Sequence, residues 1–401
     1  MLHKKLKRLV NLVFEFVPFI ISSILPKNPN IWIFGAWFGN NYSDNSKYLF
    51  EYALRVNGLR NDCKTQCYWI YKNKTNFNGF GVNFVYCYSI KGIYLQLRSG
   101  VAVMSQDRDD FYRPIVAGRT KLVQLWHGFP LKKIGADARR KHSSPLKETV
   151  AVSVNNITEF IFPFTRDRYD IVVAASDYDA EIFAKAFRVE RNRVKITGYP
   201  RNDALVASRL NSGCQKNVIY LPTFRGLPGS GFDVFLQFGF NAERIDFVLK
   251  SLDIELHIKM HPAHSLSGAV RREVLKADRI KFLDSGIDLY TVLPKYEILI
   301  TDYSSVYVDY LLLGGKILLA QFDLDSYIES SRDSYMKFDK LPSDAHCGSW
   351  REIEVALPRV LGSHRPKVIN ELIEEQVAKF HRFTDSNSSS RVYEVIQTEF
   401  K

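Results

Sequence analysis

The sequence lacks the short motifs that mark the commonest metal, disulfide and nucleotide sites. Its 401 residues contain five cysteines and no CxxC pair, which is typical of reduced cysteines in a cytoplasmic protein. Neither a Walker A loop nor a GxGxxG sequence is present, so the sequence indicates neither P-loop nor simple dinucleotide-binding chemistry. No apolar run reaches the roughly 20 residues that a membrane-spanning helix needs.

Acidic residues are the minority among the charged ones, with 43 Asp and Glu against 55 Lys and Arg and a formal net charge of +12. This excess suits a polyanionic partner, which could be a phosphate-rich substrate, an anionic lipid or a nucleic acid. The basic residues are scattered, and no aromatic and basic module of an RNA-binding protein is present. We therefore expect no nucleic-acid partner.

The N-terminal segment 1–29 has the pattern of a membrane-surface helix. Four basic residues at positions 4–8 precede the stretch LVNLVFEFVPFIISSILP, which two polar residues and a proline interrupt. No small-residue cleavage site follows, so a secretory signal peptide is not indicated. The pattern predicts an amphipathic helix in the headgroup layer, with Phe14, Phe16 and Phe19 inserted. The alternative is a helix packed on the body of the protein.

Short apolar runs alternate with helical patterns from residue 30 onward, as in parallel sheets with crossover helices. The first series starts with IWIFG (31–35), and the second starts at Asn217 after the polar stretch 208–217. We predict an α/β protein with two Rossmann-like, doubly wound domains, 30–210 and 211–385, facing a cleft. This arrangement is called GT-B in nucleotide-sugar transferases. A last helical stretch, 386–401, could cross back to the first domain.

The segment VQLWHGFPLKKIG (123–135) carries the candidate base. Its strand is expected to end at Trp126, which would place His127 at the carboxyl edge of the sheet. A histidine there can act as a general base because its pKa lies near the working pH. Gly128 permits close approach of a ligand, and Lys132 adds positive charge. The alternative for His127 is a structural hydrogen bond.

Two segments of the second half have the pattern of phosphate contacts. His261 follows the strand pattern ELHIKM and could donate to a phosphate oxygen. In ITDYSSVYVDY the strand is expected to stop at Asp302 and a helix to start near Ser304. Ser304 and Ser305 would then lie where the unpaired N–H groups of a helix start favour an anion. Plain helix capping is the alternative.

Arginines and hydroxyls after other strands complete the candidate site. Arg201 in TGYPRND, and Thr223 and Arg225 in YLPTFRG, each follow a predicted strand, where arginine suits bidentate binding of phosphate. An ion pair with a structural acid explains such an arginine equally well. Asp385 in FTDSNSSSRV could contact sugar or glycerol hydroxyls. We interpret DRDD (107–110) as an acidic turn, and no motif requires a metal.

Seven of these segments, in register over residues 30–392, resemble the CDP-glycerol glycerophosphotransferase family of teichoic acid and capsule synthesis. The segments are FGAWFGNNYSDNSKYLFEY, QLWHGFPLKKIG, ITGYPRND, YLPTFRG, KMHPAH, ITDYSSVYVDY and FTDSNSSSRV. The resemblance implies a GT-B-like fold, a membrane-associated N-terminus, an acceptor-side first domain and a second domain that binds CDP-glycerol. It also implies roles for individual residues: His127 as base, with His261 also catalytic, and donor contacts from Gly128, Lys132, Arg201, Thr223, Arg225, His261, Ser304, Ser305 and Asp385.

The chain departs from the family pattern at two places. Serine follows Asp385 where the family usually has glycine, which weakens that assignment, and GGK (314–316) replaces a usual Lys-Pro. The long extra N-terminal region of many polymerases is also absent, which favours a priming or short-chain enzyme.

The resemblance implies that an acceptor hydroxyl attacks the phosphorus that carries glycerol and that CMP leaves. We expect the acceptor to be a lipid-linked saccharide or a polyol-phosphate polymer, and the protein to lie peripherally on the cytoplasmic face of an anionic membrane. No cofactor is required by this reading, and stimulation by Mg²⁺ stays open. The alternatives are a CDP-ribitol or other CDP-polyol phosphotransferase, a GT-B sugar transferase, and a basic scaffold protein without catalysis.

Overall fold

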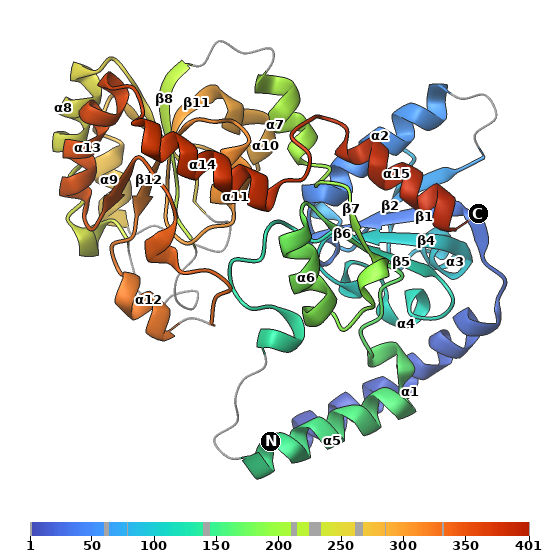
Figure 1. Cartoon of the computed structure of the whole chain (residues 1–401). Helices are drawn as coiled ribbons and strands as arrows, with labels where there is room; N and C mark the ends of the chain where they lie inside the picture. The colour runs from blue at the N-terminus through green and yellow to red at the C-terminus, as the bar shows by residue number, and fades with distance from the viewer. Residues whose placement is uncertain are drawn as a thin grey trace. The chain divides into compact units, whose positions relative to one another are not determined.

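The computed structural model describes residues 2–59, 64–77, 79–138, 145–209, 215–223, 234–260, 268–284, 286–330 and 333–400. The chain divides into two compact units (Figure 1). Unit 1 consists of Met1–His127, Ile134–Asp203 and Asn387–Lys401, and unit 2 consists of Gly128–Lys133 and Ala204–Ser386. Unit 1 thus gives way to unit 2 after Asp203, whereas the sequence-based boundary at 210 falls outside the described residues.

Unit 1 is built on a parallel sheet that has seven strands within the described residues, in the order β3-β2-β1-β4-β5-β6-β7. Its central strands are nearly continuous apolar runs, because helices cover both faces of a parallel sheet. The strand order reverses between β1 and β4, the kind of position where doubly wound domains bind ligands. The strands are β1 Asn28–Gly35, β2 Gln66–Tyr71, β3 Phe84–Tyr86, β4 Ser99–Met104, β5 Lys121–Gln124, β6 Ile171–Ala174 and β7 Val194–Ile196.

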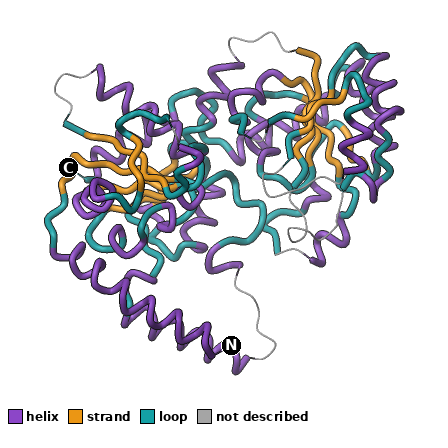
Figure 2. Tube along the Cα trace, turned by 180° about the vertical axis from the view of Figure 1, so that it is seen from behind, coloured by secondary structure: helices purple, strands orange, loops and turns teal. Residues whose placement is uncertain are grey.

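Helices connect these strands and flank the sheet (Figure 2). Helix α6 shows how the sequence sets a helix start: Ser176 and Asp179 form a capping box in which each side chain bonds the other's backbone N–H. Helix α5 was not predicted from the sequence. The helices of unit 1 are α1 Leu2–Ile24, α2 Asp44–Leu59, α3 Ile90–Arg98, α4 Arg113–Val116, α5 Pro145–Ile161, α6 Asp177–Ala186 and α15 Ser388–Glu399. Helix α7, Asn202–Arg209, begins in unit 1 and continues into unit 2.

The N-terminal helix α1 packs on the body of unit 1 through one of its sides. The Ser22 hydroxyl donates to the Ile115 carbonyl oxygen of α4 at 2.5 Å. Gly118 permits this approach, since a Cβ there would lie 2.7 Å from the Ser22 hydroxyl oxygen. No helix in the described segments is long and apolar enough to cross a bilayer.

The side chains of α1 divide between the body and the exterior differently from the prediction. Phe16 and Phe19 contact Phe162 and Phe164, with ring centroids 5.9 and 5.6 Å apart. These two rings are therefore not free to insert into a membrane, which corrects the expectation for them. Phe14, by contrast, is 73% exposed. One side of α1 is thus packed on the body, as the alternative has it, and the other side is exposed; the helix in the headgroup layer stays a prediction.

Unit 2 repeats the same topology with a sheet of six strands in the described part of the chain, in the order β10-β9-β8-β11-β12-β13. Its order reverses between β8 and β11, which makes their carboxyl ends the candidate ligand position. The strands are β8 Gln215–Leu221, β9 Leu256–Ile258, β10 Ile280–Phe282, β11 Tyr296–Thr301, β12 Lys316–Ala320 and β13 Ala345–Cys347. The short strand β13 was missed because it offers no apolar run.

The core of unit 2 gathers around Trp350, which is fully buried and contacts the rings of Tyr220, Phe235 and Phe240. This aromatic cluster joins β8 to α13. The helices of unit 2 are α8 Ala242–Ser251, α9 Gly268–Val274, α10 Leu289–Val292, α11 Val306–Leu311, α12 Leu324–Ser330, α13 Trp350–Gly362 and α14 Lys367–Phe380.

The C-terminal helix α15 belongs to unit 1 (Figure 1). The Asp203 carboxylate accepts hydrogen bonds from the backbone N–H groups of Ser388 and Ser389, each at 2.8 Å. Tyr393 donates to the Asn57 side-chain oxygen of α2 at 2.7 Å. The serines of FTDSNSSSRV therefore start a helix in unit 1, and Asp203 of PRND holds that helix start.

Candidate active site

His127 lies three residues beyond the end of β5. The strand ends at Gln124, not at Trp126 as predicted, because Trp126 has a left-handed φ of +56° that a strand does not allow. The Gln124 side chain accepts the Trp126 N–H at 2.9 Å and closes the turn. His127 nevertheless follows the carboxyl end of β5, the edge at which doubly wound domains bind ligands.

A buried ion pair holds the backbone of this turn. Arg201 Nη1 donates to Asp44 Oδ1 at 2.8 Å and to the His127 carbonyl oxygen at 2.7 Å. Asn45 donates to the Trp126 carbonyl oxygen at 2.9 Å and accepts the Arg201 N–H at 3.1 Å. Asp44 and Arg201 are only 8% and 3% exposed. Arg201 thus orients His127, and its role as a donor contact stays a prediction.

Asp44 and Asn45 are site residues that the sequence reading missed. They stand at the start of α2 in the sequence SDN, whose residue types are common at helix starts and do not by themselves indicate a site. Asp44 has a φ of +66°, so its backbone is held in a conformation that few residues other than glycine adopt. A capping residue does not need that conformation, and the pairing with Arg201 supplies the reason for it.

The imidazole ring of His127 is held in one tautomer. Its Nδ1 lies 3.0 Å from the Ser105 carbonyl oxygen, which can only accept, so Nδ1 carries the hydrogen and Nε2 carries the lone pair of the neutral ring. Burial lowers the pKa of His127 below its usual value, although the nearby Asp44 carboxylate acts in the opposite direction. A neutral imidazole with a basic Nε2 is the form that a general base needs.

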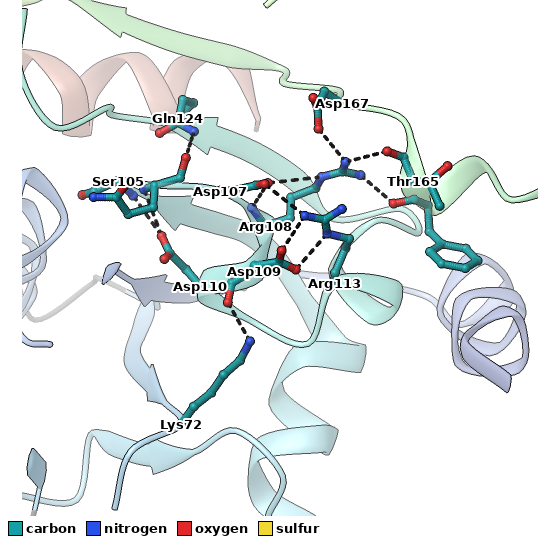
Figure 3. Close-up of polar contacts among 12 residues, drawn as sticks. Lys72, Ser105, Asp107, Arg108, Asp109, Asp110, Arg113, Gln124, Thr165 and Asp167 are labelled. Carbon is teal, nitrogen blue, oxygen red and sulfur yellow. Dashed lines mark hydrogen bonds and ion pairs between the residues drawn. The ribbon is translucent and has the colours of Figure 1, made fainter. Parts of the chain in front are cut away.

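Asp110 holds the backbone of Ser105 through its N–H group (Figure 3). Its carboxylate accepts the backbone N–H groups of Ser105 at 3.2 Å, Gln106 at 3.1 Å and Phe38 at 2.6 Å. Phe38 follows β1 and Ser105 follows β4, so the contact joins the two strands at which the sheet order reverses. Burial raises the pKa of Asp110 to about 7. The acidic turn 107–110 therefore positions the acceptor of the His127 ring.

The residues that follow His127 belong to unit 2. Gly128 has a φ of +126°, which only glycine adopts without strain. Lys132 forms an antiparallel bridge with Ser334, and its ammonium lies 4.6 Å from the ring centroid of Tyr327. Lys133 pairs with Asp333 at 3.0 Å. One motif thus supplies a histidine to unit 1 and cations to unit 2.

Thr223 and Asp302 meet where β8 and β11 end in unit 2. The Thr223 N–H lies 2.9 and 3.1 Å from the two Asp302 carboxylate oxygens, and its hydroxyl donates to the same carboxylate. The Tyr303 N–H donates to Asp302 Oδ1 at 2.6 Å. Because β8 and β11 flank the point where the strand order reverses, the predicted residue Thr223 lies at the candidate ligand position.

Ser304 and Ser305 lie just before α11, which begins at Val306. Ser305 is the N-cap residue, but its side chain makes no capping hydrogen bond. Ser304 Oγ accepts the Val306 N–H only at a long 3.4 Å. Both residues are half-buried. Plain capping therefore accounts for little of this pair, and both hydroxyls remain suited to a ligand.

Tyrosine rings connect these serines to Lys132. Tyr303 stacks on Tyr327 with centroids 3.7 Å apart, and the Lys132 ammonium lies over the Tyr327 ring. The Tyr303 hydroxyl donates to Asp323 at 3.1 Å. Unit 2 therefore brings together three of the predicted segments, LKK, YLPT and ITDYSS.

Three predicted residues remain. His261 and Arg225 fall outside the described residues, and Asp385 is exposed near the end of unit 2. Among the residues that the structure describes, no three His, Cys, Asp or Glu side chains gather in a metal-binding group.

Polar groups are therefore present at the candidate ligand position of each unit: a histidine with a fixed tautomer after β5 in unit 1, and hydroxyl and carboxylate side chains where β8 and β11 end in unit 2. The fold is that of the wall teichoic acid polymerase TagF, with a TM-score of 0.70 at 21% identity over 100% of this chain and 97% of that one. This likeness places the chain in the GT-B-like class of two-sheet α/β proteins.

Sequence comparisons identify the family. A model of the CDP-Glycerol:Poly(glycerophosphate) glycerophosphotransferase family matches residues 18–398, and the chain belongs to this family. The teichoic acid glycerol-phosphate transferase of Staphylococcus aureus (strain NCTC 8325 / PS 47) is 28% identical over 96% of each chain. The teichoic acid poly(glycerol phosphate) polymerase of Bacillus spizizenii is 29% identical over 81% of this chain and 82% of its own. The predicted family and enzyme class are confirmed.

Proposed function

We propose that this enzyme transfers glycerol phosphate from CDP-glycerol to a hydroxyl of a teichoic acid precursor or polymer and releases CMP. Family membership and the names of the two relatives support the reaction. The observation that carries the mechanism is the contact from His127 Nδ1 to the Ser105 carbonyl, because it leaves Nε2 as the basic atom.

In this mechanism the acceptor hydroxyl attacks the phosphorus that carries glycerol. His127 Nε2 takes the hydroxyl proton, a new oxygen–phosphorus bond forms, and the bond from that phosphorus to the bridging oxygen breaks. CMP leaves with the bridging oxygen and its electron pair. Asp110, Ser105, Asp44 and Arg201 do not touch the reacting atoms; they hold the ring and the backbone of His127 in place.

The donor phosphates bind to unit 2 in this proposal. Ser304 and Ser305 provide hydroxyls, Lys132 provides positive charge, and the Asp302 carboxylate holds Thr223 in the same turn region. Fixed donors and charges that face a phosphate stabilise the charge that moves during phosphoryl transfer. The proposal includes no required cofactor. Turnover should therefore persist after treatment with EDTA.

Replacement of the base tests the mechanism. We expect His127→Ala to lose about 10²–10⁴-fold in CMP release while it keeps its affinity for CDP-glycerol, because a base acts in the transition state. Added imidazole should restore part of the turnover. The matched control is His257→Ala, since His257 bonds Glu255 and Tyr296 within unit 2 and has no role in the proposal. Normal turnover of the His127 variant would overturn the assignment.

A donor screen tests the substrate. CDP-glycerol, CDP-ribitol and nucleotide sugars are each incubated with the enzyme and a membrane fraction, and release of the nucleotide is followed. CDP-glycerol should give the fastest release. Faster release from CDP-ribitol would replace the donor in this proposal and leave the base unaffected.

We also propose that the enzyme binds peripherally to the cytoplasmic face of an anionic membrane, with a lipid-linked acceptor. Besides Phe14, α1 exposes Val13 and Val17, and the end of α5 exposes Ile157 and Phe160, the last at 87%. The two helices lie along the same edge of unit 1 in both views (Figures 1 and 2), and Phe16 joins α1 to Phe162, directly after α5. Apolar side chains on neighbouring helices are typical of a surface that enters the headgroup layer.

Flotation with anionic liposomes tests this surface. Phe14→Ser with Phe160→Ser should release the enzyme from the liposomes, as should deletion of residues 1–25. The control is Phe247→Ser, because Phe247 is an equally exposed ring, at 74%, on α8 of unit 2. Equal flotation of all three proteins and the parent would contradict the proposal.

A further inference from the structure

Unit 1 contains a cavity of about 450 Å³ on the opposite edge of its sheet from His127. Its walls come mainly from the segments that precede β5, β6 and β7, together with Phe19 of α1 and the side chain of Arg108, which reaches in from the turn after β4. His127 follows β5, and all these strands are parallel. The cavity therefore lies at the amino ends of the strands and is separate from the candidate active site.

The cavity is strongly basic, with five arginines in its walls against two carboxylates. One carboxylate is already neutralised, because Arg108 donates to Asp167 at 2.9 Å (Figure 3). Arg108 also donates to the Phe164 carbonyl oxygen at 3.0 Å, so it holds the wall formed by residues 164–167. The lining arginines are Arg108, Arg166, Arg168, Arg188 and Arg193.

Two of these arginines have their charge free for a ligand. Arg166 and Arg188 are exposed, and neither side chain makes a hydrogen bond or an ion pair with another described residue. Arg193 reaches the Tyr169 carbonyl oxygen at 3.4 Å, and Arg168 reaches the Thr120 carbonyl oxygen at 3.4 Å and the Asp170 carboxylate at 3.5 Å, all of them long contacts. The cavity is therefore an array of guanidinium groups without enough internal anions.

Arg188 also occupies a backbone position that normally favours glycine. It is the second residue after α6 and has a φ of +54°. Glycine is the usual residue where a helix ends in the left-handed conformation, and another residue there has a conformational cost. Helix termination does not explain an arginine at this position, whereas a role of its side chain in the cavity does.

One wall of the cavity is apolar. It is formed by Phe19 of α1 with Leu122, Pro163 and Val189. Guanidinium groups bind phosphate oxygens in pairs, and the adjacent apolar side chains suit a hydrocarbon chain. A ligand that carries both groups fits both walls.

We propose that this cavity binds the phosphate headgroup of an anionic phospholipid, with its acyl chains against α1. The proposal goes beyond glycerol phosphate transfer and rests on the proposed membrane association only for access to lipid. The site would select anionic lipid and fix the rotation of unit 1 on the membrane, which diffuse attraction by scattered lysines would not do.

Calorimetry with a short-chain phosphatidylglycerol below its micelle concentration tests the site without a bilayer and without CDP-glycerol. Failure here is therefore distinct from failure of membrane association or of catalysis. The parent protein should bind this lipid, and Arg166→Gln with Arg188→Gly should weaken binding about tenfold or more, because each lost guanidinium removes charge-assisted bonds to phosphate.

The variant and its control separate binding from folding and from net charge. Because glycine is favoured at position 188, the Arg166→Gln, Arg188→Gly variant should keep the thermal midpoint of the parent. Arg271→Gln with Lys276→Gln removes the same charge from exposed positions of unit 2 and should bind lipid as the parent does. Equal loss in both double variants would overturn the proposal, since net charge would then explain the binding.

Two further ligands test whether the cavity binds a lipid headgroup or a free phosphate ion. Inorganic phosphate and a short-chain phosphatidylcholine should each bind at least tenfold more weakly than the phosphatidylglycerol. Phosphate that binds as tightly would show a free-anion site and overturn the lipid assignment. Phosphatidylcholine that binds as tightly would overturn the role of the arginines.

Discussion

In unit 1 the turn after β5 is held by a cation, whereas in unit 2 the turn after β11 is held by an anion. Arg201 reaches the backbone of His127 while it pairs with Asp44, and Asp302 collects the N–H groups of Thr223 and Tyr303. In both turns the charged motif residue is occupied by protein groups. The atoms left for a ligand belong to neutral neighbours, the His127 ring in one case and two serine hydroxyls in the other.

This comparison teaches that charge within a motif is a poor guide to ligand contact at a strand end. A buried charged group is stable only when it forms an ion pair or hydrogen bonds. Its bonding capacity is therefore often taken by the protein groups of the turn that it holds, and little of it remains for a ligand. Each of the following tests removes one side of the comparison, in order of decreasing effect.

Loss of Arg201 should have the largest effect on stability. Arg201→Ala leaves Asp44 buried without its partner, which should lower the free energy of unfolding of unit 1 by about 3–5 kcal/mol. Denaturant unfolding measures this. The control is Arg191→Ala, since Arg191 pairs with Asp177 and Glu181 on the surface and should contribute only about 0–1 kcal/mol. Similar losses in the two variants would mean that the Asp44 pair does not organise the turn.

Loss of the Asp302 anion in unit 2 should have the next largest effect on stability. Asp302→Asn removes the charge that holds two backbone N–H groups but keeps one acceptor oxygen, so the loss should be about 1.5–3 kcal/mol, the contribution of one hydrogen bond to a charged group. We expect a lower free energy of unfolding of unit 2 and weaker binding of CDP-glycerol, by unfolding and calorimetry. Asp325→Asn, an exposed change on α12, is the control. If donor affinity were unchanged, Asp302 would be only a structural residue.

Loss of the serine hydroxyls should affect the donor and spare the fold. Ser304→Ala with Ser305→Ala should weaken CDP-glycerol binding about tenfold, since each hydroxyl bond to phosphate is of the order of 1 kcal/mol. Ser349→Ala gives the opposite pattern: its hydroxyl caps α13 by accepting the Glu352 N–H, so the change should cost about 1 kcal/mol of stability and no donor affinity. A double variant that behaves like Ser349→Ala would return both serines to capping.

The pH dependence should show the smallest effect. A general base must be deprotonated, so kcat/KM rises with pH through the pKa of His127 in the free enzyme. Burial lowers this pKa from its usual 6.5, and activity should therefore persist below pH 6.5 before it falls. The measurement is a pH profile of kcat/KM for CMP release. A midpoint above pH 6.5 would mean that the Asp44 carboxylate outweighs burial.

The sheets could be predicted from the sequence and the turns could not. Strands such as β4 and β6 contain continuous apolar runs because both faces of a parallel sheet are buried, and that pattern is local. The frame around His127 depends on Arg201 and Asp44, which lie 157 residues apart, and no local pattern reports such a pair. For the same reason the sequence identified His127 and missed Asp44, Asn45 and the support from Asp110.

The N-terminal helix is a second case in which the sequence predicts an element but not its contacts. The sequence predicted a surface helix at the N-terminus, but it could not tell that Phe16 and Phe19 meet Phe162 and Phe164 while Phe14 does not. An apolar stripe is equally suited to a lipid surface and to a protein surface. Only the position of the partner rings decides between them.

The docking of α15 on unit 1 bears on how the protein is made by the ribosome. Residues 387–401 are synthesised after the whole of unit 2, yet Tyr393 packs on Trp32 of the first strand, with ring centroids 5.3 Å apart, and Ser388 and Ser389 bond Asp203. Unit 1 therefore stays incomplete, with Trp32 lacking the ring that covers it, throughout translation of unit 2. Unit 2 is free of this delay and can reach its fold first, so the order of folding during translation is the reverse of the order in which the two units begin.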